Sequence, residues 1–245
     1  MHKTDAAGLV LFGDSYAPVT SSIGIVRASL QEVAEELRQW RAEIHGAATV
    51  RPLDGGLLEN VMRLEPLTGG VRPRELLVAT QHKDWTALFD CGVQGGDQVT
   101  TVAVLARRMV VQGLAVTSIL DRRAGNGLPE QYGARQFELF GPFPNPVLNS
   151  VRAISVVRDY GRWRFDVAGT VQDYEDVEAY SRRRISDRFT TEMLCNYASA
   201  VGVDPFDDDF YPGPSVLVSN PAVVPPAGLS LTFVEARRRY GIVDQ

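Results

Sequence analysis

Cysteine and histidine are scarce in this chain. Cys91 and Cys195 are the only cysteines among 245 residues, and the three histidines are His2, His45 and His82. Two thiols in a chain of this length do not make the disulfide framework of a small secreted protein. The cysteines and histidines also lack the paired spacing of a zinc site. We therefore expect neither a metal ion nor another cofactor.

Long apolar runs are lacking as well. No stretch approaches the ~18 residues that a membrane-spanning helix needs. The first residues carry one lysine and the short apolar run Leu9–Phe12, which does not match the hydrophobic region of a secretory signal. The sequence therefore predicts a cytoplasmic protein.

Lysine is almost missing, and acidic residues outnumber basic ones. Lys3 and Lys83 are the only lysines among 25 basic residues; the arginine excess is typical of a GC-rich bacterial genome. The formal net charge is −5 and the sequence pI is about 5.3. Phosphate recognition usually requires a basic surplus, so a nucleic acid partner is disfavoured. We interpret the arginine clusters at residues 107–108, 122–123, 182–184 and 237–239 as solvated faces.

Capping signals followed by apolar periodicity predict the helices. Ser29 and Glu32 have the spacing of a capping box, and the stripe behind them predicts a helix that ends near Gly46. The stripe consists of Leu30, Val33, Leu37, Trp40 and Ile44. Further helices are predicted between Asp97 and Gly113, over residues 176–184, from Thr190 to Gly202, and from Thr232 to Gly241.

Short apolar runs separated by glycine and proline predict the strands. They fall at residues 57–64, 75–80, 85–89, 114–120, 135–140, 151–158 and 162–167. A strand, a glycine-rich loop, a helix and a strand follow one another over residues 85–120, which suggests one crossover unit. Because strands cluster instead of alternating with helices, we expect an α+β fold. Its sheet should be mostly antiparallel, with about six to eight strands and helices largely on one face.

The chain divides into three predicted parts. Residues 1–18 show no sustained period and are expected to be an N-terminal tail with at most one short strand. Residues 19–211 are expected to form a single α+β domain. Residues 212–245 are expected to form a proline-rich arm followed by a short last helix. Within the arm, residues 212–228 are expected to form neither a regular helix nor a central strand. Because valine and leucine interleave the prolines, this arm should be extended and packed on its own domain or on another subunit.

A glycine-rich loop is the first candidate site. Gly92, Gly95 and Gly96 lie between a predicted strand and a helix N-terminus, where free amides and the helix dipole favour an anion. The loop lacks the lysine and the spacing of a phosphate-binding loop. Asp97 also places a carboxylate at the helix start, where it can cap the helix itself. A structural turn and a loop for a small ligand both remain open.

Cys91 and His82 are the candidate catalytic pair. A helix N-terminus near Cys91 would lower the pKa of its thiol and activate it as a nucleophile. His82, on the hairpin before the same strand, would serve as the base, and Asp84 or Asp90 would orient it. The alternative is that these residues are structural.

Trp85 opens its predicted strand beside a polar turn. An exposed tryptophan next to Asp84 and His82 would suit an interface hot spot. The alternative is a half-buried edge residue.

These patterns favour a non-catalytic bacterial protein that binds another protein, such as a neutraliser of the antitoxin or immunity type. An acidic surface favours a basic partner by electrostatic steering. Two alternatives remain open. One is a hydrolase or transferase built on Cys91, His82, Asp90 and the loop from Gly92 to Asp97. The other is a structural or assembly subunit, including a homo-oligomer, that docks through residues 212–245.

Overall fold

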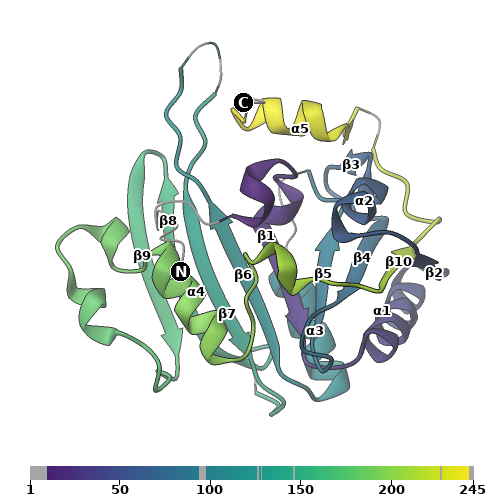
Figure 1. The fold of residues 1–245 in the computed structure, drawn as a ribbon, viewed down its shortest axis with the longest axis horizontal. Helices are drawn as coiled ribbons and strands as arrows, with labels where there is room; N and C mark the ends of the chain where they lie inside the picture. The colour runs from purple at the N-terminus through teal and green to yellow at the C-terminus, as the bar shows by residue number, and fades with distance from the viewer. Residues whose placement is uncertain are drawn as a thin grey trace.

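The computed structural model describes residues 10–93, 98–125, 127, 129–145, 147–226 and 228–242. Its centre is a nine-stranded sheet in the order β2-β10-β4-β5-β1-β6-β7-β8-β9 (Figure 1). The strands are β1 (Ser22–Val26), β2 (Thr49–Leu53), β4 (Arg74–Ala79), β5 (Thr86–Asp90), β6 (Gly113–Ile119), β7 (Ala134–Phe140), β8 (Ser150–Asp159), β9 (Arg162–Gly169) and β10 (Ser215–Ser219). A separate two-stranded ribbon joins β3 (Leu67–Thr68) and β11 (Ser230–Leu231).

Five α-helices and several 3-10 turns surround the sheet within the described residues. The helices are α1 (Leu30–His45), α2 (Leu57–Val61), α3 (Gln98–Met109), α4 (Thr191–Ala200) and α5 (Phe233–Arg239). The 3-10 turns are η1 (Leu11–Asp14), η2 (Val19–Ser21), η3 (Met62–Leu64), η4 (Val177–Ser181), η5 (Ile185–Asp187) and η6 (Asp208–Phe210). In this part of the chain no helix is long and apolar enough to cross a membrane.

The predicted α+β class is confirmed. All neighbouring strands of the large sheet pair antiparallel, and nine strands are present where about six to eight were expected. The crossover is also confirmed, because α3 connects β5 to β6. These two strands run parallel to each other on either side of β1, which is antiparallel to both.

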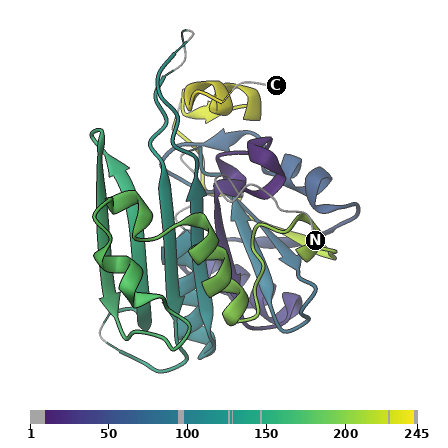
Figure 2. The same cartoon turned by 60° about the vertical axis from the view of Figure 1, so that its left-hand side comes forward.

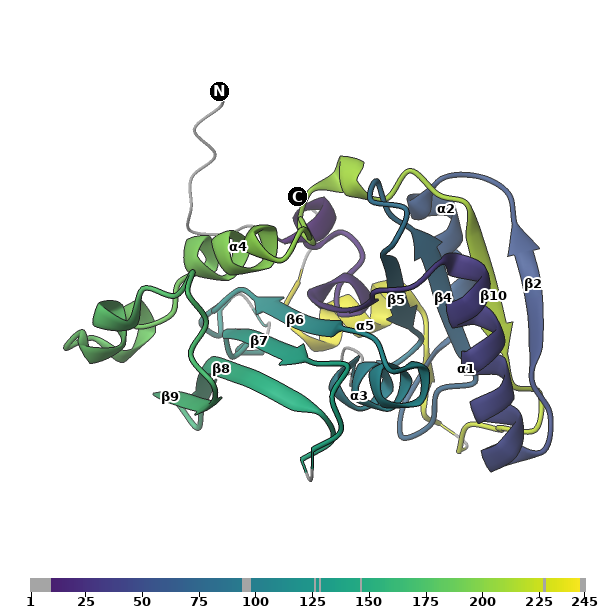
Figure 3. The same cartoon turned by 90° about the horizontal axis from the view of Figure 1, so that it is seen from below.

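The two longest helices lie on one face of the sheet, which we call the helical face. α1 packs on β2, β10 and β4, and α3 packs on β5, β1, β6 and β7 (Figure 3). Their apolar residues form one core cluster with inward residues of the sheet, including Val26, Leu77 and Phe140. The opposite face carries a larger cluster, covered by α2, α4 and the 3-10 turns (Figure 2).

The sequence predicted both ends of α1 correctly. Its capping box is present, because the Ser29 hydroxyl accepts from the Glu32 amide and the Glu32 carboxylate accepts from the Ser29 amide. The helix ends at Gly46, whose positive φ of 85° suits glycine. Leu37 is fully buried, but the predicted stripe stops before Ile44, which is 52% exposed.

Three segments differ from prediction. Residues 57–64 form α2 and η3 instead of a strand, because Leu57, Val61 and Leu64 bury one helical side. Residues 176–184 contain the 3-10 turn η4 instead of an α-helix. The described part of the predicted tail belongs to the core, since Leu11 and Ala17 are buried.

The expectation that residues 212–228 cannot hold a central strand was wrong. β10 pairs with β2 on one side and with β4 on the other, and Leu217 and Val218 are buried on its two sides. The prolines lie outside Ser215–Ser219, so every residue of the strand keeps its amide proton. Within this segment, Ser215–Ser219 is extended and packs in this chain's own sheet.

Candidate functional site

Cys91 lies in the protein core. Its side chain is fully buried at the end of β5, and its sulfur lies 3.4 Å from the Thr68 hydroxyl. Burial raises the pKa of the thiol, which is the opposite of what an activated nucleophile requires. The buried position therefore favours a packing role.

His82 and Cys91 are not brought together. His82 is exposed on the hairpin before β5, where its ring lies 6.0 Å from that of Phe210, whereas Cys91 follows the other end of the strand. Asp84 is on the same hairpin and forms an exposed ion pair with Arg27. The histidine has neither the thiol nor Asp90 within reach, because β5 separates them.

Trp85 is not an exposed interface residue. Only 3% of its surface is accessible, and the Arg27 guanidinium lies 5.6 Å from the centre of its ring. The predicted exposure of Trp85 was therefore wrong. The polar turn before it contributes exposed residues, but the indole packs into the core from the position just before β5.

Asp90 forms the centre of a buried charged cluster. Its carboxylate accepts from the Gly92 amide at 2.7 Å and from the Gln98 side-chain amide at 3.2 Å, and it pairs with Arg72 at 3.1 Å. Burial raises the pKa of Asp90 to about 6, although Arg72 and the Gly92 amide favour the charged form. Asp90 therefore ties the loop after β5 to the first residue of α3.

A second ion pair adjoins this cluster. Arg41 of α1 donates to both carboxylate oxygens of Glu75, at 2.8 and 2.5 Å, and reaches Thr101 of α3 at 3.3 Å. Glu75 lies directly opposite Asp90 in the β4–β5 ladder. These groups satisfy one another, so they connect α1, α3 and the sheet and offer no free ligand.

The candidate glycine loop is described in part. The amide of Gly92 donates a hydrogen bond to the Asp90 carboxylate, and Gly92 forms a parallel β-bridge with Thr68. Gly95, Gly96 and Asp97 lie outside the described residues. Anion binding by this loop and the Asp97 cap therefore remain predictions.

A row of polar side chains crosses the outer half of the sheet. Each member lies directly opposite the next in the ladders, from β1 through β6, β7 and β8 to β9. Directly opposite residues share a face of a sheet. The row, which we call the polar row, consists of Ser22, Thr117, Gln136, Ser155 and Asp166.

The polar row lies on the helical face, just beyond α3. A Cβ atom added to Gly24 would meet Val102 and Gln98 of α3, so Gly24 faces that helix. Ser22 is two residues earlier on the same strand and therefore points to the same side. Ser22 and Thr117 are largely buried, whereas Asp166 at the far end is exposed.

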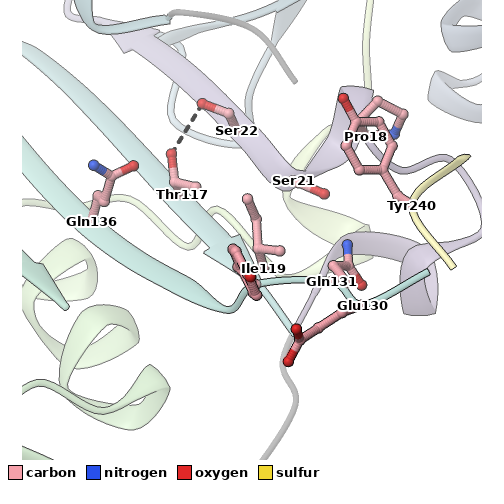
Figure 4. A pocket seen from close by; sticks show the side chains of 10 residues that line it. Pro18, Ser21, Ser22, Thr117, Ile119, Glu130, Gln131, Gln136 and Tyr240 are labelled. Atoms are coloured by element: carbon pink, nitrogen blue, oxygen red, sulfur yellow. Dashed lines mark hydrogen bonds between the residues drawn. The ribbon is translucent and has the colours of Figure 1, made fainter. Parts of the chain in front are cut away.

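Two cavities open over the polar row, and both are lined by Gln136. The first, of about 350 Å³, contains Ser22 and Thr117, whose hydroxyl oxygens are 3.1 Å apart, with Glu130 and Tyr240 at its wall (Figure 4). The second, of about 320 Å³, lies over β7, β8 and β9 and contains Ser155 and Asp166. Together they form an open surface that the polar row crosses.

The charge of this surface is acidic. The linings of the two cavities contribute three carboxylates, from Glu130, Glu138 and Asp166, and no lysine, arginine or histidine among the described residues. Glu130 also pairs with Arg158 at 2.7 Å. Asp166 is exposed at the outer end of the polar row.

Sequence reasoning missed this surface because its members lie far apart in the chain. Ser22 and Asp166 belong to the same row only through the register of four ladders. Alternation on each strand could have shown which residues share a side, but not which strands are neighbours. No protein-family model, curated protein or solved structure matches the chain.

Proposed function

We propose that this protein binds another protein and that the polar row receives a basic, extended segment of that partner. The observation that carries the proposal is the open acidic surface over five strands. This surface lies on the helical face of the sheet, the face on which α1 and α3 also pack.

The length of the row fits a peptide better than a small molecule. Five neighbouring strands span four gaps of about 4.8 Å, or roughly 19 Å. An extended chain rises about 3.3 Å per residue, so roughly six residues would follow the row. Serine and threonine hydroxyls with a glutamine amide supply donors and acceptors for the polar atoms of such a segment.

Charge supports a basic partner. The whole chain carries a formal net charge of −5, and the carboxylates of Glu138 and Asp166 lie in the outer cavity. A surface of one sign attracts the opposite sign and increases the rate of encounter. The association should therefore weaken as salt is added.

The alternative of a thiol enzyme has less support. It requires a reactive Cys91 beside His82, and these residues lie at opposite ends of β5, with the thiol buried. The alternative of an assembly subunit requires a free arm after residue 211, and β10 from that segment lies inside the sheet.

The experiment uses a labelled peptide of alternating lysine and serine, with a glutamate–serine peptide of the same length for comparison. Fluorescence anisotropy at low salt should show binding of the lysine peptide alone. Gln136→Arg should weaken it at least about tenfold, because both cavities gain a bulky positive group.

Glu178→Gln is the matched control for Gln136→Arg. It changes the net charge by the same amount at an exposed position of η4, away from both cavity linings. Equal loss in the two variants would show general attraction to an acidic protein and would contradict the proposal. Absence of lysine-peptide binding to the wild type would contradict it as well.

A further inference from the structure

β9 is an edge strand with unused backbone groups. It pairs with β8 through a hairpin whose turn residues, Tyr160 and Gly161, both have positive φ. In a two-residue hairpin the residues that flank the turn form a hydrogen-bonded pair, and such pairs alternate along the ladder. Arg162, Arg164 and Asp166 therefore bond to β8, and the residues between them point their amides and carbonyls outward.

The outward residues of β9 are Trp163, Phe165 and Val167. No backbone partner besides β8 is present for them among the described residues. An open row of such groups is a template for another strand. Nothing in the strand blocks pairing chemically, because Arg162–Gly169 contains no proline.

The charges on this strand discriminate between ways of pairing. Arg164 and Asp166 are neighbours on the helical face, one on each side of Phe165. Charged residues on an edge usually prevent strand association. Here the two signs are placed symmetrically about one residue, so a strand of the same sequence in antiparallel orientation meets each charge with its opposite.

We propose that β9 pairs with β9 of a second copy of this chain, antiparallel and centred on Phe165. In this register Phe165 faces Phe165 of the second copy, and Trp163 faces Val167. Each of these is an outward-facing pair, so about six main-chain hydrogen bonds form between the two strands. Arg164 faces Asp166 on both sides of the centre, in the closer, non-hydrogen-bonded pairs.

Other registers are unfavourable. A shift of one residue places outward groups opposite groups already bonded to β8, so the ladder cannot form. A shift of two residues places Arg164 opposite Arg164, or Asp166 opposite Asp166, according to its direction. Like charges directly opposite each other destabilise a sheet. Charge therefore selects the register centred on Phe165.

On the face opposite the polar row, β9 packs against η5, and the Arg188 guanidinium lies 5.8 Å from the centre of the Phe165 ring. Phe165 and Trp163 point to the opposite face, where Tyr180 contacts Phe165 at 5.2 Å between ring centres. Val167 is 45% exposed and would be covered by Trp163 of the second copy. Figures 1 and 3 show β9 at the end of the sheet, next to β8 alone among the strands.

Arg164 already has one partner within the chain. Its guanidinium lies 3.3 Å from Asp159, and the two side chains are 65% and 39% exposed. Exposed pairs of this kind contribute little and keep their solvent contacts. Arg164 can therefore share its charge between Asp159 and Asp166 of the second copy.

The first experiment measures mass by sedimentation equilibrium over a range of concentrations. The wild type should dimerise, and Arg164→Asp or Asp166→Arg should raise the dimer dissociation constant at least about tenfold. The double variant R164D/D166R should restore dimerisation, because each charge again meets its opposite. Arg183→Asp, on an exposed residue with the same charge change as Arg164→Asp, should leave the dissociation constant unchanged.

The second experiment tests the register by oxidation. A mixture of R164C and D166C proteins should form a disulfide-linked heterodimer, because Cα atoms in a non-hydrogen-bonded pair lie about 4.5 Å apart. Neither variant alone should link. The unmodified chain, with buried Cys91 and half-buried Cys195, is the background control.

Two results would overturn the inference. One is a wild type that stays monomeric at all concentrations reached. The other is a dimer that survives R164D and D166R equally, or that links through R164C alone. Neither result bears on the lysine-peptide test, which uses Gln136 and Glu178.

Discussion

The inner and outer parts of the sheet differ in how they are covered. Every residue of β1 and β5 is buried, and both faces of these strands pack against helices or turns. β9 has no buried residue, and on β8 the residues of the helical face are half-buried. The same continuous sheet therefore has a buried centre and a solvent-exposed edge.

The sequences of these strands explain the difference. β5 reads TALFD, with an apolar centre that suits burial on both sides, whereas β9 reads RWRFDVAG and alternates charged with aromatic residues. Alternation is typical of a sheet with one packed face and one face in water. Mutations in the inner strands should therefore affect folding, and mutations at the outer edge should mainly affect association.

The largest expected difference is between two phenylalanines. Phe89→Ala should lower the free energy of unfolding by about 3–5 kcal/mol, because Phe89 is fully buried in β5. Phe165→Ala in β9 should cost roughly half as much, since its ring is only half-buried. Urea unfolding at a concentration where the protein is monomeric measures both. Equal losses would remove the distinction between the two regions.

A second pair of substitutions compares the buried and the exposed side of α1. Leu37→Ala should cost about 2–5 kcal/mol, because Leu37 is fully buried on the side of α1 that faces the sheet. Arg38→Ala should change the free energy of unfolding by no more than about 0.5 kcal/mol, since its pair with Glu35 is a surface pair. Comparable losses in chemical denaturation would show that α1 does not pack as described.

The buried cluster of the inner region gives a pH effect. The pKa of Asp90 is raised from 3.8 to about 6, so the folded protein holds this proton more tightly than the unfolded chain. The stabilisation from Asp90 is complete below pH 3.8 and is lost as the pH rises through about 6.

Relative to Asp90→Asn, the wild type should therefore lose stability between those pH values, by about 1.4 kcal/mol for each unit that separates the two pKa values. Unfolding of both proteins at several pH values measures the difference. A constant difference between wild type and Asp90→Asn would contradict the burial of this charge.

The smallest expected effect concerns the two thiols. Burial raises the pKa of Cys91, and it raises that of Cys195 to about 11. Native protein should therefore react slowly with iodoacetamide at neutral pH, and the half-buried Cys195 should react before Cys91. Mass spectrometry of timed samples identifies the site. Rapid modification of Cys91 in folded protein would restore the nucleophile hypothesis.

Local signals in the sequence predicted much of the secondary structure. The capping box at Ser29, the helix that begins after Thr232, and the strands over residues 151–158 and 162–167 are present, because each depends on residues within a few positions. The run at residues 57–64 was assigned to a strand although Leu57, Val61 and Leu64 already had helical spacing. Periodicity carried more information there than the apolar character of the run.

Features that depend on register could not be predicted. β2 was missed because its exposed residues and Pro52 give it no apolar alternation, and its only ladder within the described residues is with β10. The polar row and the burial of Trp85 also depend on which strands become neighbours. Candidate sites chosen from adjacent residues therefore fell on packing positions, while the open surface lay between distant ones.

The position of β10 sets an order of events during synthesis. β2 finds its ladder partner only after Ser215–Ser219 has been made, so Thr49–Leu53 leaves the ribosome long before it can pair. β4 likewise has one edge unpaired until then, although it can join β5 at once through their short hairpin. Contacts between such distant segments slow folding. The nascent chain thus carries an unfinished sheet edge through most of translation, and closing that edge is among the last steps by which the molecule matures.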